Sequence, residues 1–203
     1  MKTYPSISRE VPSGLSVYAF SKLDGSNVRA EWTRKQGICK IGSRKRLLGS
    51  DQGILVRAEA LIREQEVELA AIAKENRWDK LTLFFEFLGP SSFAGNHVEG
   101  EQQSVYLIDV APHKQGIMPP REFCKTFEGR VPTAPLLYHG PCDGEFVESV
   151  RAGTLEGMPF EGVVCKASQS RHKLVMFKIK SRAWLERLKE HCQGDERLFE
   201  QLR

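Results

Sequence analysis

Short apolar runs of strand length recur along the chain, and they constrain the fold more than any other feature of the sequence. Alternating or continuous apolar residues predict strands at 16–21, 27–34, 37–41, 81–88, 104–110, 134–138, 162–167 and 173–180. Helical spacing predicts one long amphipathic helix between residues 54 and 78, and shorter helices at 119–127, 144–151 and 183–192. Because strands and helices do not alternate regularly, we expect an α+β fold with antiparallel sheets flanked by helices.

The size and composition of the chain fit a folded domain. Its 203 residues suit one domain with a small appendage, and 40% apolar with 28% charged residues disfavours disorder. We assign residues 1–181 to that domain and residues 182–203 to a short helical C-terminal tail. The net charge of +4 is compatible with a polyanionic partner but does not require one.

The cysteines and the apolar runs indicate a cellular compartment. The five cysteines are scattered without a CxxC pair, which favours reduced thiols over a disulfide framework or a zinc site. No apolar run follows the charge at the N-terminus, and none approaches the roughly 20 residues of a membrane helix. The sequence therefore predicts a soluble cytoplasmic protein, either an enzyme or a binding domain.

A lysine near the N-terminus lies in the segment Lys22-Leu23-Asp24-Gly25-Ser26-Asn27. In a strand, residues two apart share a face, so Lys22 and Asp24 would point into the same space. Gly25 would let the backbone turn or a ligand approach closely. Alone, such a segment is usually a solvated turn.

Two further lysines, Lys178 and Lys180, alternate with Phe177 and Ile179 in a predicted strand. Both lysines would share one face of that strand, where their charges repel each other. An anion such as a phosphate would explain the pair. The alternative is an exposed basic face on an amphipathic edge strand.

Single carboxylates also stand within or beside apolar strands, at Glu86, Asp109 and Glu161. A lone buried carboxylate is costly unless it is paired, metal-bound or hydrogen-bonded, so each could instead be a structural salt bridge. Together with the lysines they suggest a phosphoryl-transfer site. Neighbouring cations make a neutral lysine nucleophile accessible, and Asp24, Glu86 and Glu161 could hold Mg²⁺ or Mn²⁺.

At this point the chain resembles the covalent nucleotidyltransferase superfamily, and within it the ATP-dependent RNA ligases similar to the T4 RNA ligase 2 branch. The matching motifs follow one another in the family's order and spacing: residues 22–27, Ser43-Arg44, 85–89, 106–110, 161–166 and 177–180. Each motif alone is weak, whereas six in order are strong. The resemblance implies a nucleotidyltransferase (ATP-grasp-like ligase) domain.

The resemblance also implies a reaction in three steps. Lys22 attacks the α-phosphate of ATP and releases pyrophosphate, AMP passes to an RNA 5′-phosphate, and a 3′-hydroxyl then displaces AMP. By motif position Lys178 and Lys180 would bind the α-phosphate, and Glu161 would help to place the metal. The resemblance further implies a role in RNA repair.

The remaining motif positions imply contacts with the nucleoside. Arg44 and Glu86 would contact the ribose, and Asn27 would act near the phosphate or the strand end. The family usually has an aromatic residue directly before the aspartate of the 106–110 motif, and Ile108 stands there in this chain. Either Ile108 covers the adenine, or Tyr106 contributes from two residues earlier.

The RNA strand is expected to meet basic residues beside these motifs. They are Arg44, Lys45, Arg46 and Lys173, whose phosphate contacts would make binding salt-sensitive. The segment after the last motif is too short for an OB-fold; a separate domain or partner protein could supply that part, and whether the short chain seals ends alone stays open. The alternatives are a DNA-nick ligase or another polynucleotide adenylyltransferase, and a non-catalytic nucleic-acid-binding module.

Overall fold

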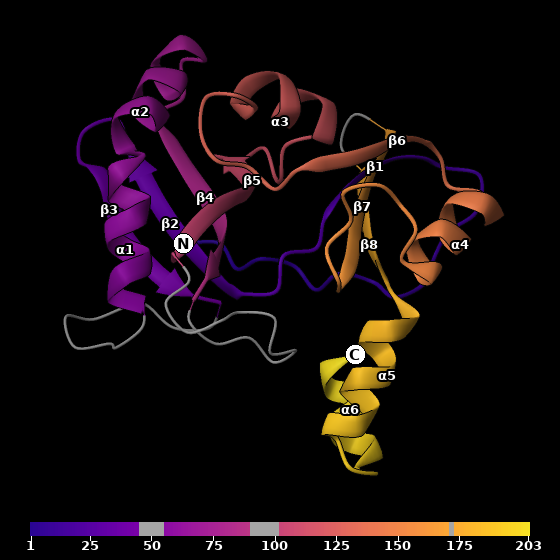
Figure 1. The fold of residues 1–203 in the computed structure, drawn as a ribbon. Coiled ribbons are helices and arrows are strands. Elements are labelled where there is room, and N and C mark those ends of the chain that lie inside the picture. The colour runs from indigo at the N-terminus through magenta and orange to yellow at the C-terminus, as the bar shows by residue number, and fades with distance from the viewer. Residues whose placement is uncertain (45–54, 90–101, 171–172) are drawn as a thin grey trace. The chain divides into compact units, whose positions relative to one another are not determined.

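The structure is a computed structural model that describes residues 1–44, 55–89, 102–170 and 173–203 (Figure 1). The chain divides into two compact units. The first contains Met1–Ser6 and Gly25–Ala134, and the second contains Ile7–Asp24 and Pro135–Arg203. The chain therefore passes between the units three times, and one passage lies between Asp24 and Gly25.

The first unit is built on a four-stranded antiparallel sheet with the strand order β3-β2-β4-β5. Its strands are β2 (Ser26–Thr33), β3 (Gly37–Ser43), β4 (Lys80–Leu88) and β5 (Ser104–Pro112), and its helices are α1 (Leu55–Glu64), α2 (Glu66–Glu75) and α3 (Pro120–Phe127). Helix α1 packs on β5 and α2 on β3. The apolar residues of β4, such as Leu83 and Phe85, are fully buried in this core.

The second unit has a separate antiparallel sheet with the strand order β6-β1-β7-β8. Its strands are β1 (Ser16–Ser21), β6 (Leu136–Pro141), β7 (Gly162–Ser170) and β8 (Lys173–Lys180), and its helices are α4 (Gly144–Ala152), α5 (Arg182–His191) and α6 (Glu196–Leu202). Helix α4 packs on β7 and β8, where Phe146 and Val150 meet Val163 and Phe177.

The expected α+β fold with antiparallel sheets flanked by helices is confirmed, but two elements differ from the prediction. The single helix expected over 54–78 is wrong: two helices are separated at Gln65. Its side chain donates to the carbonyl oxygen of Val105, and the next residue, Glu66, accepts the backbone N–H of Ile38 at 2.6 Å. These contacts with the sheet are tertiary, so helical spacing alone does not reveal the break. The strand expected over 134–138 lies at Leu136–Pro141.

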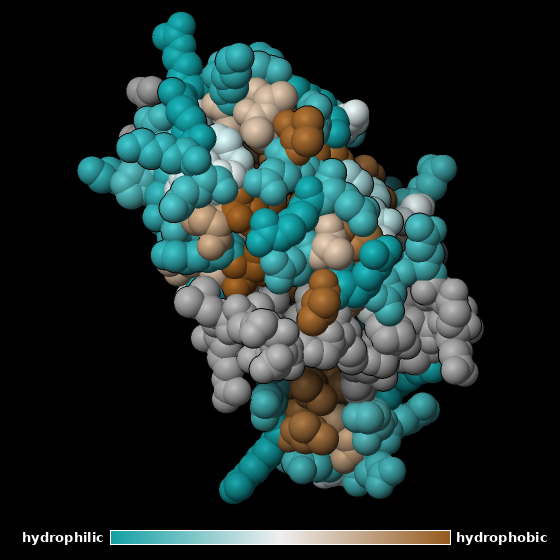
Figure 2. All heavy atoms as spheres, turned by 90° about the vertical axis from the view of Figure 1, so that its left-hand side faces the viewer, coloured by the Kyte–Doolittle hydropathy of each residue, from teal (hydrophilic) through white to brown (hydrophobic). Residues whose placement is uncertain are grey.

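The predicted tail over 182–203 contains α5 and α6, which belong to the second unit. The predicted boundary between residues 181 and 182 does not coincide with a boundary between the two units. The division into a domain over 1–181 and a tail stays a prediction. In the described part of the chain, no helix is long and apolar enough to cross a membrane. The face of the first unit that carries α1 and α2 is mostly hydrophilic, with apolar side chains visible between the hydrophilic ones (Figure 2).

One face of the first unit's sheet carries buried polar residues. Asn27, Arg29 and Glu31 occupy alternate positions of β2 and so share that face. The Arg29 guanidinium is buried and donates to the carbonyl oxygen of Lys2 at 2.9 Å and to the hydroxyl of Thr3 at 3.0 Å. The N-terminal segment is therefore tied to this face of the sheet.

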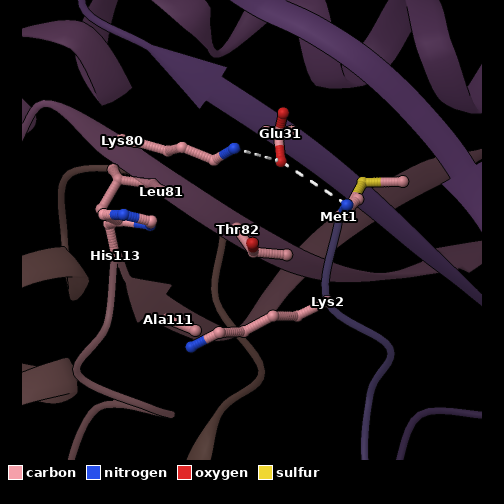
Figure 3. A pocket seen from close by; sticks show the side chains of 8 residues that line it. All are labelled: Met1, Lys2, Glu31, Lys80, Leu81, Thr82, Ala111 and His113. Carbon is pink, nitrogen blue, oxygen red and sulfur yellow. Dashed lines mark ion pairs between the residues drawn. The ribbon is translucent and has the colours of Figure 1, made fainter.

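Glu31, on the same face, forms ion pairs with three cations, and Figure 3 shows those with Lys80 and Met1. Lys80 lies 2.8 Å from the Glu31 carboxylate, Lys40 lies at 3.5 Å and the ammonium of Met1 at 3.7 Å, beside a pocket of about 300 Å³. Burial favours the neutral acid, but the hydrogen bond from Lys80 and the three positive charges outweigh it, so the pKa of Glu31 is lowered.

Glu31→Gln is expected to lower the free energy of unfolding at pH 7 by about 1–3 kcal/mol, because the buried ammonium of Met1 and the more exposed ammonium groups of Lys80 and Lys40 lose their charged acceptor. A lowered pKa stabilises the fold above the unfolded value of about 4.3, and this contribution is lost as the pH falls through the folded value. Urea unfolding of both proteins should therefore converge at acidic pH. Glu59→Gln, which breaks the exposed pair with Arg63, is the matched control with a smaller effect. Equal stability of wild type and Glu31→Gln at pH 7 would contradict the argument.

Candidate functional site

Two lysines and one carboxylate meet at a single oxygen atom in the second unit. Lys22 Nζ lies 2.9 Å from Oε1 of Glu161, and Lys180 Nζ lies 3.0 Å from the same atom. The carboxylate is 5% exposed, which makes this a buried, hydrogen-bonded charge cluster. Three residues that the sequence singled out separately are thus brought together.

The glycine between the two lysines makes this approach possible. The backbone N–H of Lys22 donates to the carbonyl oxygen of Gly162 at 3.0 Å, and Gly162 pairs with Lys180 across β7 and β8. Gly162 has a φ of 131°, and a Cβ there would lie 2.2 Å from the carbonyl oxygen of Ile179. A position without a side chain therefore lies between Lys22, which directly follows β1, and Lys180 at the end of β8.

The predicted alternation along β8 is confirmed. Phe177 and Ile179 are buried in the core under α4, so Lys178 and Lys180 lie on the opposite face of the strand. β8 is an edge strand of its sheet, as the alternative reading supposed. The side chain of Lys180 is nevertheless only 7% exposed, so a solvated basic face does not describe it.

The surroundings of Lys180 change its protonation equilibrium. The pKa of Lys180 is lowered to about 8, mainly by burial and also by the charges of Lys22 and Lys178, against the opposing charge and hydrogen bond of Glu161. Lys180 Nζ also donates to the carbonyl oxygen of Leu202 at 3.3 Å, and Lys178 Nζ donates to that of Arg203 at 2.9 Å. Both ammonium groups thus face acceptor oxygens at the end of α6.

Trp184 is a neighbour of Lys180 that the sequence analysis missed. Lys180 Nζ lies 3.3 Å from the centroid of the indole ring, which is 3% exposed. The available signal was an aromatic residue four positions after Lys180, but helical spacing had explained it as ordinary packing of the tail.

A second set of predicted residues lies in the first unit, across β2, β4 and β5. The strand register places Asn27 opposite Glu86, and Glu86 opposite Tyr106, and all three are partly exposed. The side-chain nitrogen of Asn27 donates to the carbonyl oxygen of Phe85 at 3.3 Å, while its Oδ1 is buried without a hydrogen-bond partner. A buried polar oxygen of this kind is available to a ligand.

A β-bulge on β5 alters which residues share this face. Leu107 pairs with Phe85 and Asp109 pairs with Phe84, so Ile108 is the extra residue between them. Without the bulge, Ile108 would pair with Phe84. In the structure Asp109 takes that position. Asp109 is fully buried, whereas Ile108 is partly exposed.

Asp109 accepts a hydrogen bond from the hydroxyl of Tyr4 at 2.5 Å. Burial raises the pKa of Tyr4 well above its usual value, as do the hydrogen bond and charge of Asp109 and the charge of Glu86, while Arg44 lowers it. Arg44 is exposed, with its guanidinium 3.5 Å from the hydroxyl of Ser6. The N-terminal segment thus lies beside the residues predicted to bind the nucleoside.

The other predicted site residues have varied outcomes. Lys45 and Arg46 lie outside the described residues, and Lys173 is exposed at the start of β8. Asp24 is partly exposed. A Cβ at Gly25 would lie 2.4 Å from the carbonyl oxygen of Phe87, so close packing against β4 already requires this glycine.

The predicted metal ligands Asp24 and Glu161 belong to the second unit, and Glu86 to the first. Among the residues that the structure describes, no group of three or more His, Cys, Asp or Glu side chains is placed to hold a metal ion. Carboxylate oxygens are nevertheless the ligands that Mg²⁺ and Mn²⁺ prefer, so the chemistry of this donor set suits such a cation. The metal site stays a prediction.

Comparison with solved structures defines the class of fold. A Naegleria gruberi RNA ligase variant with AMP and Mn matches with a TM-score of 0.68 at 19% identity, over 92% of this chain and 57% of that one. The same ligase with PPi matches with a TM-score of 0.65 at 22% identity, over 88% of this chain and 53% of that one. A candidate ATP-dependent DNA ligase from Aquifex aeolicus matches with a TM-score of 0.64 at 20% identity, over 99% of this chain and 57% of that one. The chain thus has the nucleotidyltransferase-type ligase fold and spans somewhat over half the length of these relatives.

The sequence itself identifies the family. The RNA ligase family model matches residues 15–180, which include every motif from Lys22 to Lys180. The chain belongs to the RNA ligase family. A search of curated proteins found no match.

Proposed function

We propose that this protein is an ATP-dependent RNA ligase that forms a covalent lysine–AMP intermediate at Lys22. The observation that carries the proposal is the convergence of Lys22 and Lys180 on one buried oxygen of Glu161. A nucleophilic amine beside a second cation and a carboxylate is the equipment needed to attack a phosphate. Membership of the RNA ligase family and the ATP and AMP complexes of the Naegleria gruberi ligase support it.

The first step joins Lys22 to AMP. The Nζ atom of Lys22 forms a bond to the α-phosphorus as the bond to the pyrophosphate oxygen breaks, and pyrophosphate leaves with that electron pair. The attacking amine must be neutral, and the Glu161 carboxylate lies within hydrogen-bond reach to receive its proton. The product is a phosphoramidate.

The charge that develops on the α-phosphate requires cations at fixed positions. Lys178 and Lys180 supply two, and with a pKa of about 8 Lys180 is mostly protonated at pH 7. In the structure these ammonium groups donate to the carbonyl oxygens of Arg203 and Leu202. Phosphate oxygens would accept the same hydrogen bonds when the nucleotide is bound. A divalent cation held by Asp24, Glu86 and Glu161 would neutralise further phosphate charge when bound.

The residues of the first unit would recognise the nucleoside. Glu86 and Arg44 are proposed to contact the ribose, and the buried Oδ1 of Asn27 is available to the nucleotide or the RNA end. Ile108 would supply an apolar contact to the base. Each role follows from the motif position; Asn27, Glu86 and Ile108 are partly exposed on one sheet, and Arg44 is exposed directly after β3.

The two later steps concern RNA. AMP passes from Lys22 to an RNA 5′-phosphate, and an RNA 3′-hydroxyl then attacks that phosphate and displaces AMP. Arg44, Lys45, Arg46 and Lys173 are proposed to hold the RNA backbone, with another domain or protein completing the surface. RNA repair in the cytoplasm is the proposed setting, and all five cysteines are free thiols, as a reducing compartment requires.

The test begins with α-labelled ATP and Mg²⁺, followed by denaturing electrophoresis. We expect a covalently labelled band with ATP and little label with GTP or NAD. Nicked duplexes and single strands of RNA and DNA then distinguish the RNA ligase from a DNA-nick ligase. An unlabelled wild-type protein would overturn the mechanism, and sealing of DNA nicks alone would overturn the RNA assignment.

A further inference from the structure

Helix α5 begins directly after Lys180, and its first turn is tied to the segment that carries Glu161. The Ser181 hydroxyl donates to the carbonyl oxygen of Phe160 at 2.6 Å and accepts the backbone N–H of Trp184 at 3.1 Å. The backbone N–H of Ser181 donates to the carbonyl oxygen of Glu161 at 3.1 Å. Ser181 is therefore an N-cap that fixes the helix start against Glu161.

The cap places the Trp184 ring against the end of the Lys180 side chain. The ammonium group lies 3.3 Å from the ring centroid and 3.0 Å from Glu161 Oε1, and the Lys180 side chain is 7% exposed. An ammonium held between an aromatic face and a carboxylate has few alternative rotamers. Leu188, one turn further along α5, is also fully buried but is a purely apolar packing residue.

We propose that Trp184 is a positioning residue of the ligase site, which holds the Lys180 ammonium beside Glu161 in the orientation that receives the α-phosphate. The assignment rests on the proposed function of Lys180. It extends the site from the motif strands into α5, which the family motifs do not include. Trp184 acts through Lys180 and is not assigned any contact with the nucleotide.

Trp184→Leu is expected to lower kcat/KM for ATP in self-adenylylation about thirtyfold, because the ammonium gains rotameric freedom. Trp184→Phe keeps an aromatic face and should stay within about threefold of wild type. Leu188→Ala is the matched control: it weakens the packing of α5 without touching Lys180. Thermal unfolding gives the folded fraction of this variant, and its labelling rate per folded molecule should equal that of the wild type.

A double-mutant cycle separates positioning from a general loss of structure. If Trp184 acts through Lys180, adding Trp184→Leu to Lys180→Ala should cost little beyond Lys180→Ala alone. Wild-type kinetics in Trp184→Leu, equal losses in the Leu and Phe variants, or fully additive losses in the double mutant would each overturn the assignment. The absence of label in the wild-type protein would instead overturn the proposed function.

Discussion

Lys22→Ala is expected to abolish self-adenylylation, with at least about a thousandfold loss of labelling rate, because Lys22 is the amine proposed to form the phosphoramidate, whereas Lys178 and Lys180 are proposed to bind the α-phosphate. Removal of the amine leaves Glu161 and Lys180 paired, so the fold should persist. The measurement is label incorporation from α-labelled ATP, with circular dichroism to show that the variant is folded.

Two control variants sharpen this result. Lys22→Arg keeps a positive charge near Glu161 but offers no nucleophilic amine, and should also remain unlabelled. Lys74→Ala removes an exposed lysine of α2 and should label like wild type. The wild-type label should be lost in acid and retained in alkali, as phosphoramidates are. Label that survives in both Lys22 variants would place the nucleophile elsewhere.

Glu161→Gln is expected to cause the second largest loss, about a hundredfold or more in the labelling rate at saturating ATP. The amide has nearly the same shape, but it cannot neutralise the two ammonium groups that share Oε1. It can neither receive the proton of Lys22 nor contribute a charged oxygen to a metal. The change therefore separates the charge of Glu161 from its size.

The variant should also be less stable, because a buried carboxylate has been removed from cations that remain. Thermal unfolding would report this part, and the labelling rate per folded molecule would report the rest. Glu148→Gln, which breaks the exposed pair with Arg182 in the same unit, is the matched control and should label normally. A Glu161→Gln protein with the wild-type rate would show that the charge cluster is structural only.

Much of the candidate site could be predicted from the sequence because its signals are local. Strand alternation correctly assigned Lys178 and Lys180 to the face opposite Phe177 and Ile179. Glu161 was singled out because it is an acidic residue at the start of an apolar strand that ends in a lysine. Such inferences depend on residues within a few positions of one another, where backbone geometry leaves little choice.

The rest depended on contacts between distant segments. The break at Gln65 follows from hydrogen bonds with the sheet, and the bulge at Ile108 follows from pairing with β4. Neither leaves a periodic trace in its own segment. Trp184 was missed because one aromatic residue fits helical packing and cation contact equally well.

The sequence by itself predicted most of the strands, the two faces of β8, the motif order and the residues proposed to carry the chemistry. The tertiary structure decided that Lys22 and Lys180 share one oxygen of Glu161. That outcome required β1, β7 and β8 to be neighbours in one sheet, with Gly162 between the two lysines. The order of these strands brings together segments that are far apart in the sequence, so it arises from the packing of the whole unit and not from the pattern within any one strand.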